Sequence, residues 1–173
     1  MQINPSILSA DFANLEAELM SIASADMAHV DVMDNHFVPN LTLGTAIVER
    51  LAKVSPIPLD VHLMIEYPDK WAIGYAQAGA SSVTFHLEAA TEPIDLARRL
   101  RAAGVKAAVA IKPATKVSDI AHLIQEVDML LVMTVEPGLG GQPILVETLE
   151  KIAQARQLIL GCCAKVGLQG DGA

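Results

Sequence analysis

The sequence is poor in aromatic residues, in basic residues and in long apolar runs, and each scarcity excludes a class of protein. Aromatic residues make up 3% of the 173 residues, so aliphatic side chains and methionine must fill the core. Lys and Arg number 12 against 20 Asp and Glu, a formal net charge of −8, which argues against a nucleic-acid-binding surface. No apolar run approaches the roughly 20 residues that cross a bilayer, so no membrane association is expected.

Cysteine is equally scarce. The two cysteines, Cys162 and Cys163, are adjacent, and adjacent cysteines seldom pair with each other. The chain therefore lacks the disulfide framework of a small secreted protein. The N-terminal segment MQINPSILSAD also lacks the basic stretch and apolar core of a secretory signal. Together these features predict a reducing, cytoplasmic location.

What the sequence does contain is a series of short aliphatic runs separated by segments of helical period. The runs span residues 3–8, 28–33, 58–64, 81–87, 105–111, 127–133 and 165–171. Repeated strand–helix–strand patterns indicate right-handed βαβ units with a parallel sheet. Because no Gly-rich dinucleotide turn is present, they favour a (β/α) barrel in a single domain over residues 1–173.

The segments between these runs carry signals for helices. Phe12, Leu15, Leu19 and Ile22 share one helical face, as do Ile47, Leu51 and Val54. Proline is tolerated as the first residue of a helix, which predicts helix starts at Pro68 and Pro93. Ser118 is expected to cap a helix, and Gly104 to end one.

Two adjacent predicted strands carry polar side chains on one face. Residues i and i+2 of a strand share a face, which groups His29, Asp31 and Met33 on one strand and Asp60, His62 and Met64 on the next. Thr84 and His86 share a face of the following strand. Imidazole and carboxylate groups in this arrangement suit a divalent transition metal such as Zn, Fe, Mn or Co. The alternative is that they are structural polar groups at strand ends.

Two further features could contact a substrate. The segment TVEPGLGGQ, 134–142, contains Gly138, Gly140 and Gly141, whose backbone N–H groups could bind an anion. A tight turn without a ligand is the alternative. Lys112 directly follows the run 105–111 and could contact substrate, form a Schiff base or simply lie in solvent.

At the level of motifs, the sequence resembles the ribulose-phosphate 3-epimerase family. The matching segments are PSILSADFANL (5–15), HVDVMDNHFVPN (29–40), DVHLMIEYP (60–68), GASSVTFHLEA (79–89), AIKPAT (110–115) and LVMTVEPGLGGQ (131–142). The combination of DVMDNHFVPN with MTVEPGxGGQ is specific to that family. The resemblance implies a (β/α)8 TIM barrel, isomerase activity on a small phosphorylated ketose of the pentose phosphate pathway, and a homo-oligomer.

The resemblance also implies residue roles. His29, Asp31, His62 and Asp171 would bind one divalent transition metal, and Asp31 and Asp171 would be the acid–base pair on opposite faces of the substrate. The implied substrate-binding residues are Ser6, Met33, His62, Met64, Met133, Gly138, Leu139, Gly140 and Gly141. The methionines would crowd an enediolate intermediate, while the metal stabilises its charge. Asp34 and His36 fall in the loop that follows and need no catalytic role.

The chain departs from the family pattern in several places. Asn35 stands where many members have Gly, and Leu139 where Phe is usual. The family continues through a V-D-G-G strand, an eighth strand and a Gly-Ser phosphate turn, whereas this chain ends in QGDGA. Asp171 is therefore matched over a short segment, and a tail residue out of register is the alternative. The expected fold is a C-terminally truncated barrel in which strand eight and its helix are missing.

Three functions stay open on the sequence. The first is the metal-dependent epimerisation of D-ribulose 5-phosphate to D-xylulose 5-phosphate at C3. The second is epimerisation of another ketose phosphate, such as allulose 6-phosphate. The third is a truncated, non-catalytic remnant that retains metal binding or assembly contacts. Barrel decarboxylases and synthases with a D-x-K-x-x-D motif are disfavoured, because position 33 is Met.

Overall fold

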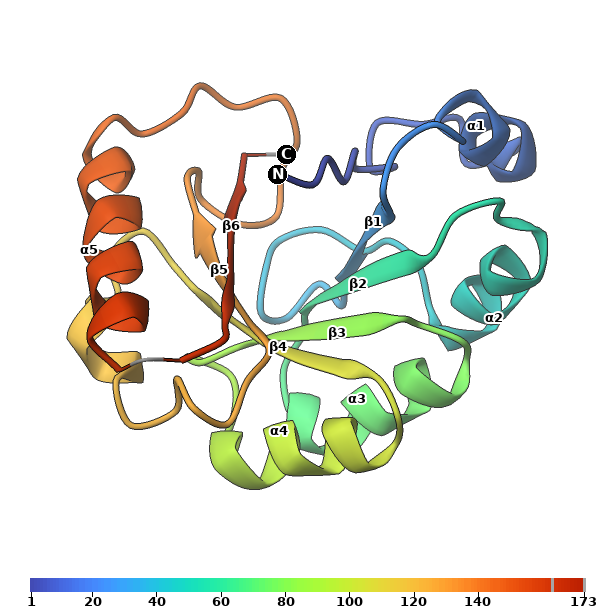
Figure 1. Ribbon diagram of the computed structural model, residues 1–173. Helices are drawn as coiled ribbons and strands as arrows, with labels where there is room; N and C mark the ends of the chain where they lie inside the picture. The colour runs from blue at the N-terminus through green and yellow to red at the C-terminus, as the bar shows by residue number, and fades with distance from the viewer. Residues whose placement is uncertain (163, 173) are drawn as a thin grey trace.

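A single curled sheet of parallel strands forms the centre of the computed structural model, which describes residues 1–162 and 164–172 (Figure 1). The strands are β1 (Ala28–Met33), β2 (Leu59–Met64), β3 (Ser82–His86), β4 (Lys106–Ile111), β5 (Met129–Met133) and β6 (Gly167–Asp171). Their order in the sheet is their order in the chain, so every connection is a crossover between parallel neighbours. Cys163 and Ala173 lie outside the described residues.

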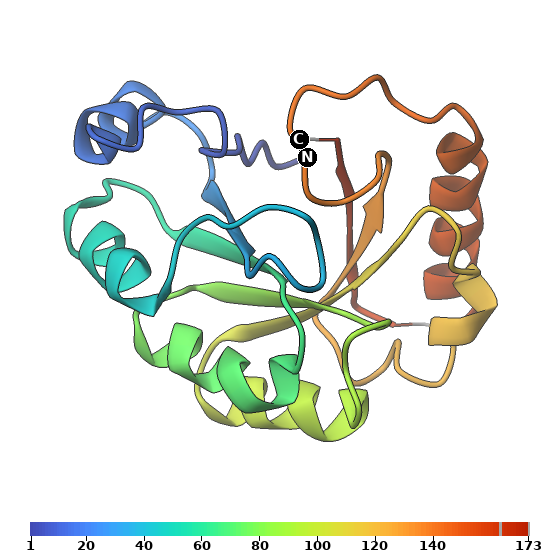
Figure 2. The ribbon, with the colours of Figure 1, turned by 180° about the vertical axis from the view of Figure 1, so that it is seen from behind.

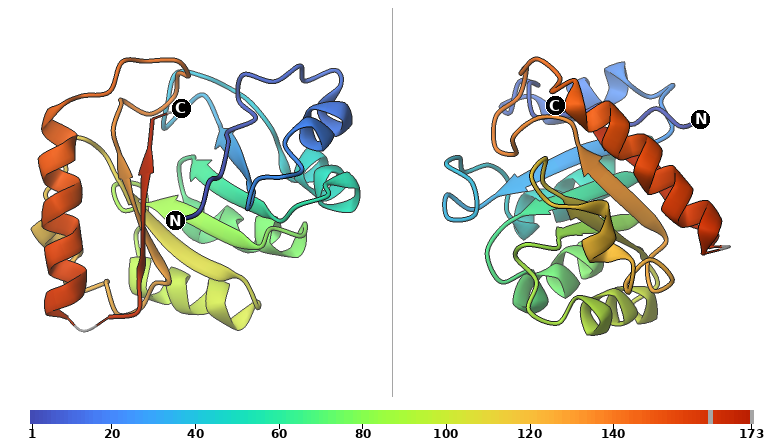
Figure 3. Two further views of the ribbon diagram at one scale, coloured as in Figure 1. Left: turned by 45° about the horizontal axis from the view of Figure 1, so that its top comes forward. Right: turned by 90° about the vertical axis from the view of Figure 1, so that its left-hand side faces the viewer.

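The helices cover the outer, convex face of the sheet, as the views from behind and from the side also show (Figures 2 and 3). They are α1 (Leu15–Ser21), α2 (Thr45–Val54), α3 (Pro68–Gln77), α4 (Pro93–Ala102), α5 (Glu147–Gly161) and the short 3₁₀-helix η1 (Val117–Ile120). Within the described ranges, no helix combines the length and the apolar character needed to cross a bilayer.

The strands form because their aliphatic residues are buried on both faces, as expected of a parallel sheet between two layers. Val30, Val61 and Val83 point outward into the main core, where Leu51 and Leu100 of the helices also lie. The inner face has two smaller apolar clusters: Met33, Val38 and Met64, and Ala110, Leu131, Met133 and Val135. The alternation predicted for the strands, with valines toward the helices, is therefore confirmed.

The predicted strand over residues 3–8 is wrong. Within this segment only Ser6 pairs, in an isolated parallel bridge to His29. The Pro5 carbonyl accepts from the His29 N–H, and the Ile7 N–H donates to the His29 carbonyl. Proline has no backbone N–H to donate, so a ladder running through Pro5 is interrupted. The segment nevertheless lies along the free edge of β1.

The helix signals succeed in part. Pro68 and Pro93 are the first residues of α3 and α4, and Gly104 has φ +86°, all as predicted. Ser118 does not cap a helix through its side chain, because it lies within η1 and its hydroxyl donates to the Asp119 side chain.

The predicted faces of the first two helices shift slightly. Phe12 precedes α1 and is 43% exposed, although Leu15 and Leu19 are buried as expected. In α2, Val48 packs beside Leu51 and Ile47 is exposed. Periodicity therefore located both helices but misplaced the edge of each apolar stripe.

Candidate active site

Four titratable side chains meet inside the curl of the sheet. His29 and Asp31 come from β1, His62 from β2 and Asp171 from the end of β6. All four are at least 94% buried, and one potential ligand atom from each lies within 4.8 Å of the others. Asp31 is paired in register with His62, and Asp171 with Met133, so these residues lie near the carboxyl ends of their strands.

The distances show two imidazole nitrogens facing two carboxylate oxygens. His29 Nε2 lies 3.3 Å from Asp31 Oδ1 and 3.5 Å from Asp171 Oδ2. His62 Nδ1 lies 3.2 Å from each of these two oxygens. The buried Nε2 of His29 makes no hydrogen bond of good geometry. A nitrogen left in that state indicates a site built for another partner, and the mixed N and O donor set fits a divalent transition metal.

The charges of the four groups depend on one another. Burial alone would lower the pKa of His29, but the neighbouring carboxylates of Asp31, Asp171 and Asp60 raise it well above the usual value. The pKa of His62 is likewise raised by Asp171 and Asp31 against the effect of burial. Burial would raise the pKa of the Asp31 and Asp171 carboxyls, yet the two imidazoles hold both well below the ordinary range. A bound divalent cation would replace the imidazole protons in stabilising these carboxylates.

Asp171, matched in sequence over only a short segment, is placed in the cluster by β6. Its carbonyl accepts hydrogen bonds of 2.7 Å from both the backbone N–H and the hydroxyl of Thr134. These bonds join the end of β6 to the residue that follows β5. The alternative of a tail residue out of register does not agree with this position.

Asp60 supports His29 from below, a role that sequence reasoning missed. Its Oδ2 lies 2.8 Å from His29 Nδ1, and its Oδ1 accepts from the Ser82 hydroxyl. Because the carboxylate accepts the Nδ1 hydrogen, Nε2 of His29 is directed into the cluster. The motif D-x-H on β2 was the available signal, since Asp60 stands two positions before His62, the partner of Asp31, and pairs in register with His29.

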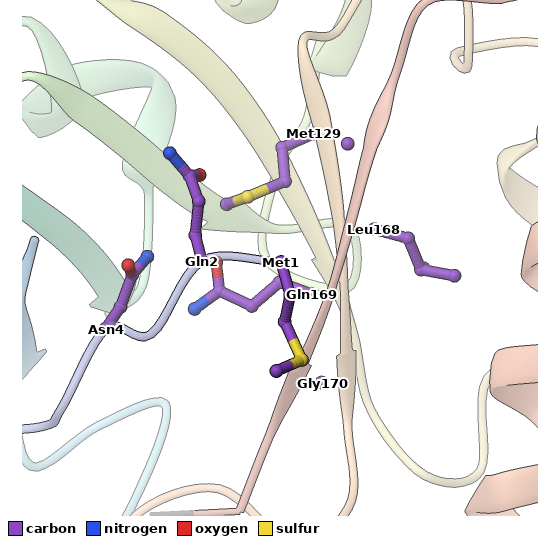
Figure 4. A pocket seen from close by; sticks show the side chains of 8 residues that line it. Met1, Gln2, Asn4, Met129, Leu168, Gln169 and Gly170 are labelled. Atoms are coloured by element: carbon purple, nitrogen blue, oxygen red, sulfur yellow. The ribbon is translucent and has the colours of Figure 1, made fainter. Parts of the chain in front are cut away.

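A polar layer continues beneath Asp60. Asn4 and Gln169 each donate to Asp60 Oδ2 at 3.4 Å. Both line a pocket of about 410 Å³ between β6 and the N-terminal segment, and Figure 4 shows their side chains on the same side of β6. Leu168 points to the other side of the strand in this view, toward the outer core. The alternation of β6 thus directs one polar side chain under the site.

His86 is a second neighbour of the cluster to which sequence reasoning gave no role. Its Nε2 lies 2.9 Å from Nε2 of His62, and its Nδ1 lies 3.2 Å from Glu88 Oε2. Burial lowers the pKa of His86 to about 4. The signal in the sequence was its position on the same face of β3 as Thr84, beside the strand that carries His62.

The residues expected to contact substrate lie around the cluster. The Ser6 hydroxyl donates to Asp31 Oδ2 at 2.6 Å, and the Leu8 N–H donates to Ser6 Oγ. Met33, Met64 and Met133 are at least 98% buried on the inner face, two residues beyond Asp31, His62 and Leu131 respectively. An apolar, polarisable wall therefore lies toward the carboxyl ends of the strands.

The glycine-rich segment forms a loop that packs against the loop after β1. Gly138 has φ +113°, and a Cβ atom there would lie 2.9 Å from Val38 Cβ. Gly141 has φ +71°, while Leu139 is 56% exposed. The Gln142 side chain donates to the carbonyls of Glu136 and Leu139, which closes the loop on itself. Anion binding by Gly138, Gly140 and Gly141 stays a prediction.

The loop after β1 is organised by Asp34, as expected of a residue outside the catalytic set. Asp34 accepts from the backbone N–H groups of His36, Phe37 and Glu66. Lys112 Nζ lies 3.8 Å from the centroid of the Phe37 ring. Neither Asp34 nor His36 belongs to the four-residue cluster.

Comparison with known proteins adds to this geometry. The sequence profile described as "Ribulose-phosphate 3 epimerase family" matches residues 2–173. A ribulose-phosphate 3-epimerase of Mycobacterium tuberculosis is 52% identical over 157 residues, covering 91% of this chain and 69% of the relative. The enzyme of the same name from Bacillus subtilis is 44% identical over 160 residues, covering 91% of this chain and 74% of the relative.

Solved structures with similar folds are more distant in sequence. A mutant tryptophan synthase alpha-subunit from Pyrococcus furiosus superposes with a TM-score of 0.69 at 8% identity, over 98% of this chain and 76% of the other. A phosphoribosyl anthranilate isomerase from Thermococcus kodakaraensis has a TM-score of 0.52 at 16% identity, over 99% and 88% of the two chains. These similarities concern the fold alone, and with the six curled parallel strands they confirm the TIM-barrel class.

Proposed function

Because the chain belongs to the ribulose-phosphate 3-epimerase family, we propose that it inverts C3 of D-ribulose 5-phosphate to give D-xylulose 5-phosphate. One observation supports this chemistry most directly. Asp31 and Asp171 come from β1 and β6, the first and last strands in the sheet order, and their carboxylates meet at the same pair of imidazoles. Two carboxylates that approach from separate strands can serve opposite faces of one carbon.

Inversion requires two proton carriers. A single carboxylate that removes the C3 proton would tend to return it to the face it left. In the proposed reaction, one of Asp31 and Asp171 removes the proton and the carboxyl of the other delivers a proton to the far face of the enediolate. The Ser6 hydroxyl donates to Asp31 Oδ2, which holds that carboxylate while Oδ1 faces the cluster.

The four clustered residues fit one divalent transition metal, Zn, Fe, Mn or Co. His29 would contribute Nε2 and His62 Nδ1, with one carboxylate oxygen from each of Asp31 and Asp171. Such an ion supplies Lewis acidity that polarises the C2 carbonyl and stabilises negative charge on the enediolate. Asp60 holds His29 in the orientation that this binding requires.

The remaining side chains bind and shield the substrate in this proposal. Met33, Met64 and Met133 exclude water from the reacting carbons, which limits side reactions of an enediolate. The backbone N–H groups of Gly138 to Gly141 bind the phosphate of the ketose. Lys112 stays outside the proton transfers, since its ammonium lies over the Phe37 ring.

The two carboxylates can be tested separately. Asp31→Asn and Asp171→Asn are each expected to lower the rate of epimerisation by about 10²–10⁴-fold, the usual contribution of a general acid or base. Xylulose 5-phosphate formation is followed with a transketolase-coupled assay on the metal-loaded chain. Asp95→Asn, at an exposed position of α4, is the matched control and is expected to keep full activity.

Two further measurements complete this experiment. Exchange of the C3 hydrogen with deuterated solvent should survive in the variant that retains the proton-removing carboxylate, and this assigns the two roles. Full activity in either Asp→Asn variant would contradict the two-carboxylate mechanism. Turnover of allulose 6-phosphate in preference to ribulose 5-phosphate would move the substrate assignment, and metal binding without any turnover would favour a non-catalytic remnant.

A further inference from the structure

We infer that His86 and Glu88 form a hydrogen-bonded chain that fixes the proton on Nε2 of His62 and leaves its Nδ1 to bind the metal. His62 Nε2 lies 2.9 Å from His86 Nε2, and His86 Nδ1 lies 3.2 Å from Glu88 Oε2. The side chains of His62 and His86 are fully buried, and that of Glu88 is 22% exposed. The role rests on the proposed metal site, but the proton position is a property of the metal-free chain.

Glu88, at the outer end of the chain, determines which atom donates in each of these hydrogen bonds. Glu88 Oε1 accepts from the Lys112 N–H at 2.7 Å and from the Thr115 hydroxyl. These donors stabilise the ionised carboxylate, which can only accept hydrogen bonds. His86 Nδ1 must therefore be the donor to Glu88. A neutral imidazole has a single N–H, so Nε2 of His86 is an acceptor.

The same reasoning then reaches His62. Since Nε2 of His86 accepts, Nε2 of His62 must donate. When His62 is neutral, its Nδ1 carries no hydrogen and directs a lone pair at Asp31 Oδ1 and Asp171 Oδ2, each 3.2 Å away. A lone pair facing two carboxylates is repelled unless a proton or a cation lies between them. The chain therefore makes the Nδ1 proton the one that a metal ion displaces.

The two ligand histidines are held by different means. His29 directs Nε2 inward because Asp60 accepts from its Nδ1 at 2.8 Å. His62 directs the opposite nitrogen, Nδ1, inward and is held from behind by His86. The centroids of the Phe37 and His86 rings lie 4.9 Å apart, so the loop after β1 covers the hydrogen-bonded chain behind His62. The covered hydrogen bonds from His62 to His86 and from His86 to Glu88 do not compete with bulk water, and they therefore fix the His62 ring more strongly.

Metal affinity tests the role of Glu88 directly. Glu88→Ala is expected to weaken Zn²⁺ binding by about 10–100-fold, the usual effect of removing a group that orients a metal ligand. Glu88→Gln should retain most of the affinity, because its side-chain carbonyl oxygen can accept the same hydrogen bond. Glu92→Ala is the matched control, since Glu92 is exposed and precedes α4 in the same loop region. Affinities are measured by chelator competition, and circular dichroism checks that each variant is folded.

The proton position is measured independently of the metal. Long-range nitrogen–proton NMR on the metal-free native chain, at a pH alkaline enough to neutralise His62, should show the hydrogen on Nε2. In Glu88→Ala the two tautomers should mix, and in Glu88→Gln they should not.

A hydrogen on Nδ1 of His62 in the native chain, or native Zn²⁺ affinity in folded Glu88→Ala, would overturn the inference. If Glu88→Ala does not fold, the native spectrum and the Glu88→Gln variant still decide. If the native chain binds no Zn²⁺ while the NMR result holds, the proposed metal site fails and the inferred proton position stands.

Discussion

At the scale of single residues, protons and a metal cation would compete for the same two imidazole nitrogens. His29 and His62 both have raised pKa values because they face Asp31 and Asp171, with Asp60 adding to the effect on His29. A metal must displace these protons before it can bind either nitrogen. Zn²⁺ affinity is therefore expected to rise with pH. Because both pKa values are raised, the rise should continue beyond about pH 6.5, the ordinary histidine pKa, and should level off once both imidazoles are neutral.

The metal-free chain should behave in the opposite way. A raised imidazole pKa contributes stability that is fully present below the unfolded pKa of about 6.5 and is lost as pH rises through the folded value. Chelator competition and thermal unfolding over a pH series would show tighter binding and lower metal-free stability toward alkaline pH. A Zn²⁺ affinity that does not change between about pH 6 and pH 9 would contradict the proton competition.

The residues of the site were predictable to the extent that strand alternation reveals them. His29, Asp31 and His62 follow from two adjacent strands with polar residues on one face. Asp60, on that same face, was grouped with them, but its support of His29 was not foreseen, because the sequence does not specify the strand register that places Asp60 opposite His29. The bond between His62 and His86 depends on the curl of the sheet, which periodicity does not specify.

At the scale of elements, α5 is fastened to the sheet by a buried lysine. Lys151 Nζ donates to the carbonyls of Lys112 and Pro113, at 2.6 Å and 3.0 Å, and the residue is 8% exposed. These carbonyls follow β4. The bonds hold α5 against the turn before η1, while the same helix also packs against β5 and β6.

Replacement of this lysine should loosen that contact. Lys151→Met keeps most of the side-chain volume but leaves both carbonyls without their donor, and is expected to lower the free energy of unfolding by about 1.5–3 kcal/mol. Denaturant unfolding monitored by circular dichroism measures the change. Arg156→Met, on the exposed side of the same helix, is the control and should change stability by less than about 0.5 kcal/mol. Equal losses in the two variants would show that the contacts of Lys151 contribute nothing.

The prediction of secondary structure succeeded for strands with uniform burial. It failed where a single residue determines the local hydrogen bonding. The strands β1 to β5 follow from largely aliphatic runs, whereas β6, with two glycines and mixed burial, carries a weaker signal. The segment 3–8 looks like a strand by composition, but the missing N–H of Pro5 limits it to a single bridge. The helix cap predicted at Ser118 failed for another reason. A short polar side chain has several local hydrogen-bonding choices, and here the hydroxyl donates to Asp119.

At the scale of the whole molecule, the proposed ligands connect strands that the sheet keeps apart. β1 and β6 are the two ends of the strand order, and the cluster brings their side chains to a common centre. A metal bound there would join both ends of the curl. Because binding to the folded chain alone stabilises it by mass action, Zn²⁺ at about 100 times its Kd should add about 2.7 kcal/mol.

Thermal unfolding with and without metal checks this prediction. Zn²⁺ or Co²⁺ should raise the Tm, and removal of the metal with a chelator should reverse the change. Mg²⁺, which prefers an octahedral shell of oxygen ligands, is the control and should have a much smaller effect. A Tm rise that persists in His29→Ala would assign the stabilisation to another site. Self-association of the chain, implied by the family resemblance, stays a prediction that sedimentation analysis of the same samples can address.

The bond between Thr134 and the carbonyl of Asp171 has a consequence for the order in which the protein is made. Three of the four clustered residues are synthesised within the first two strands, whereas Asp171 emerges after β5 and α5. A nascent chain on the ribosome would thus hold an incomplete set of ligands for most of its synthesis. In the proposed mechanism, epimerase turnover would begin only once β6 has docked and has brought Asp171 to the cluster.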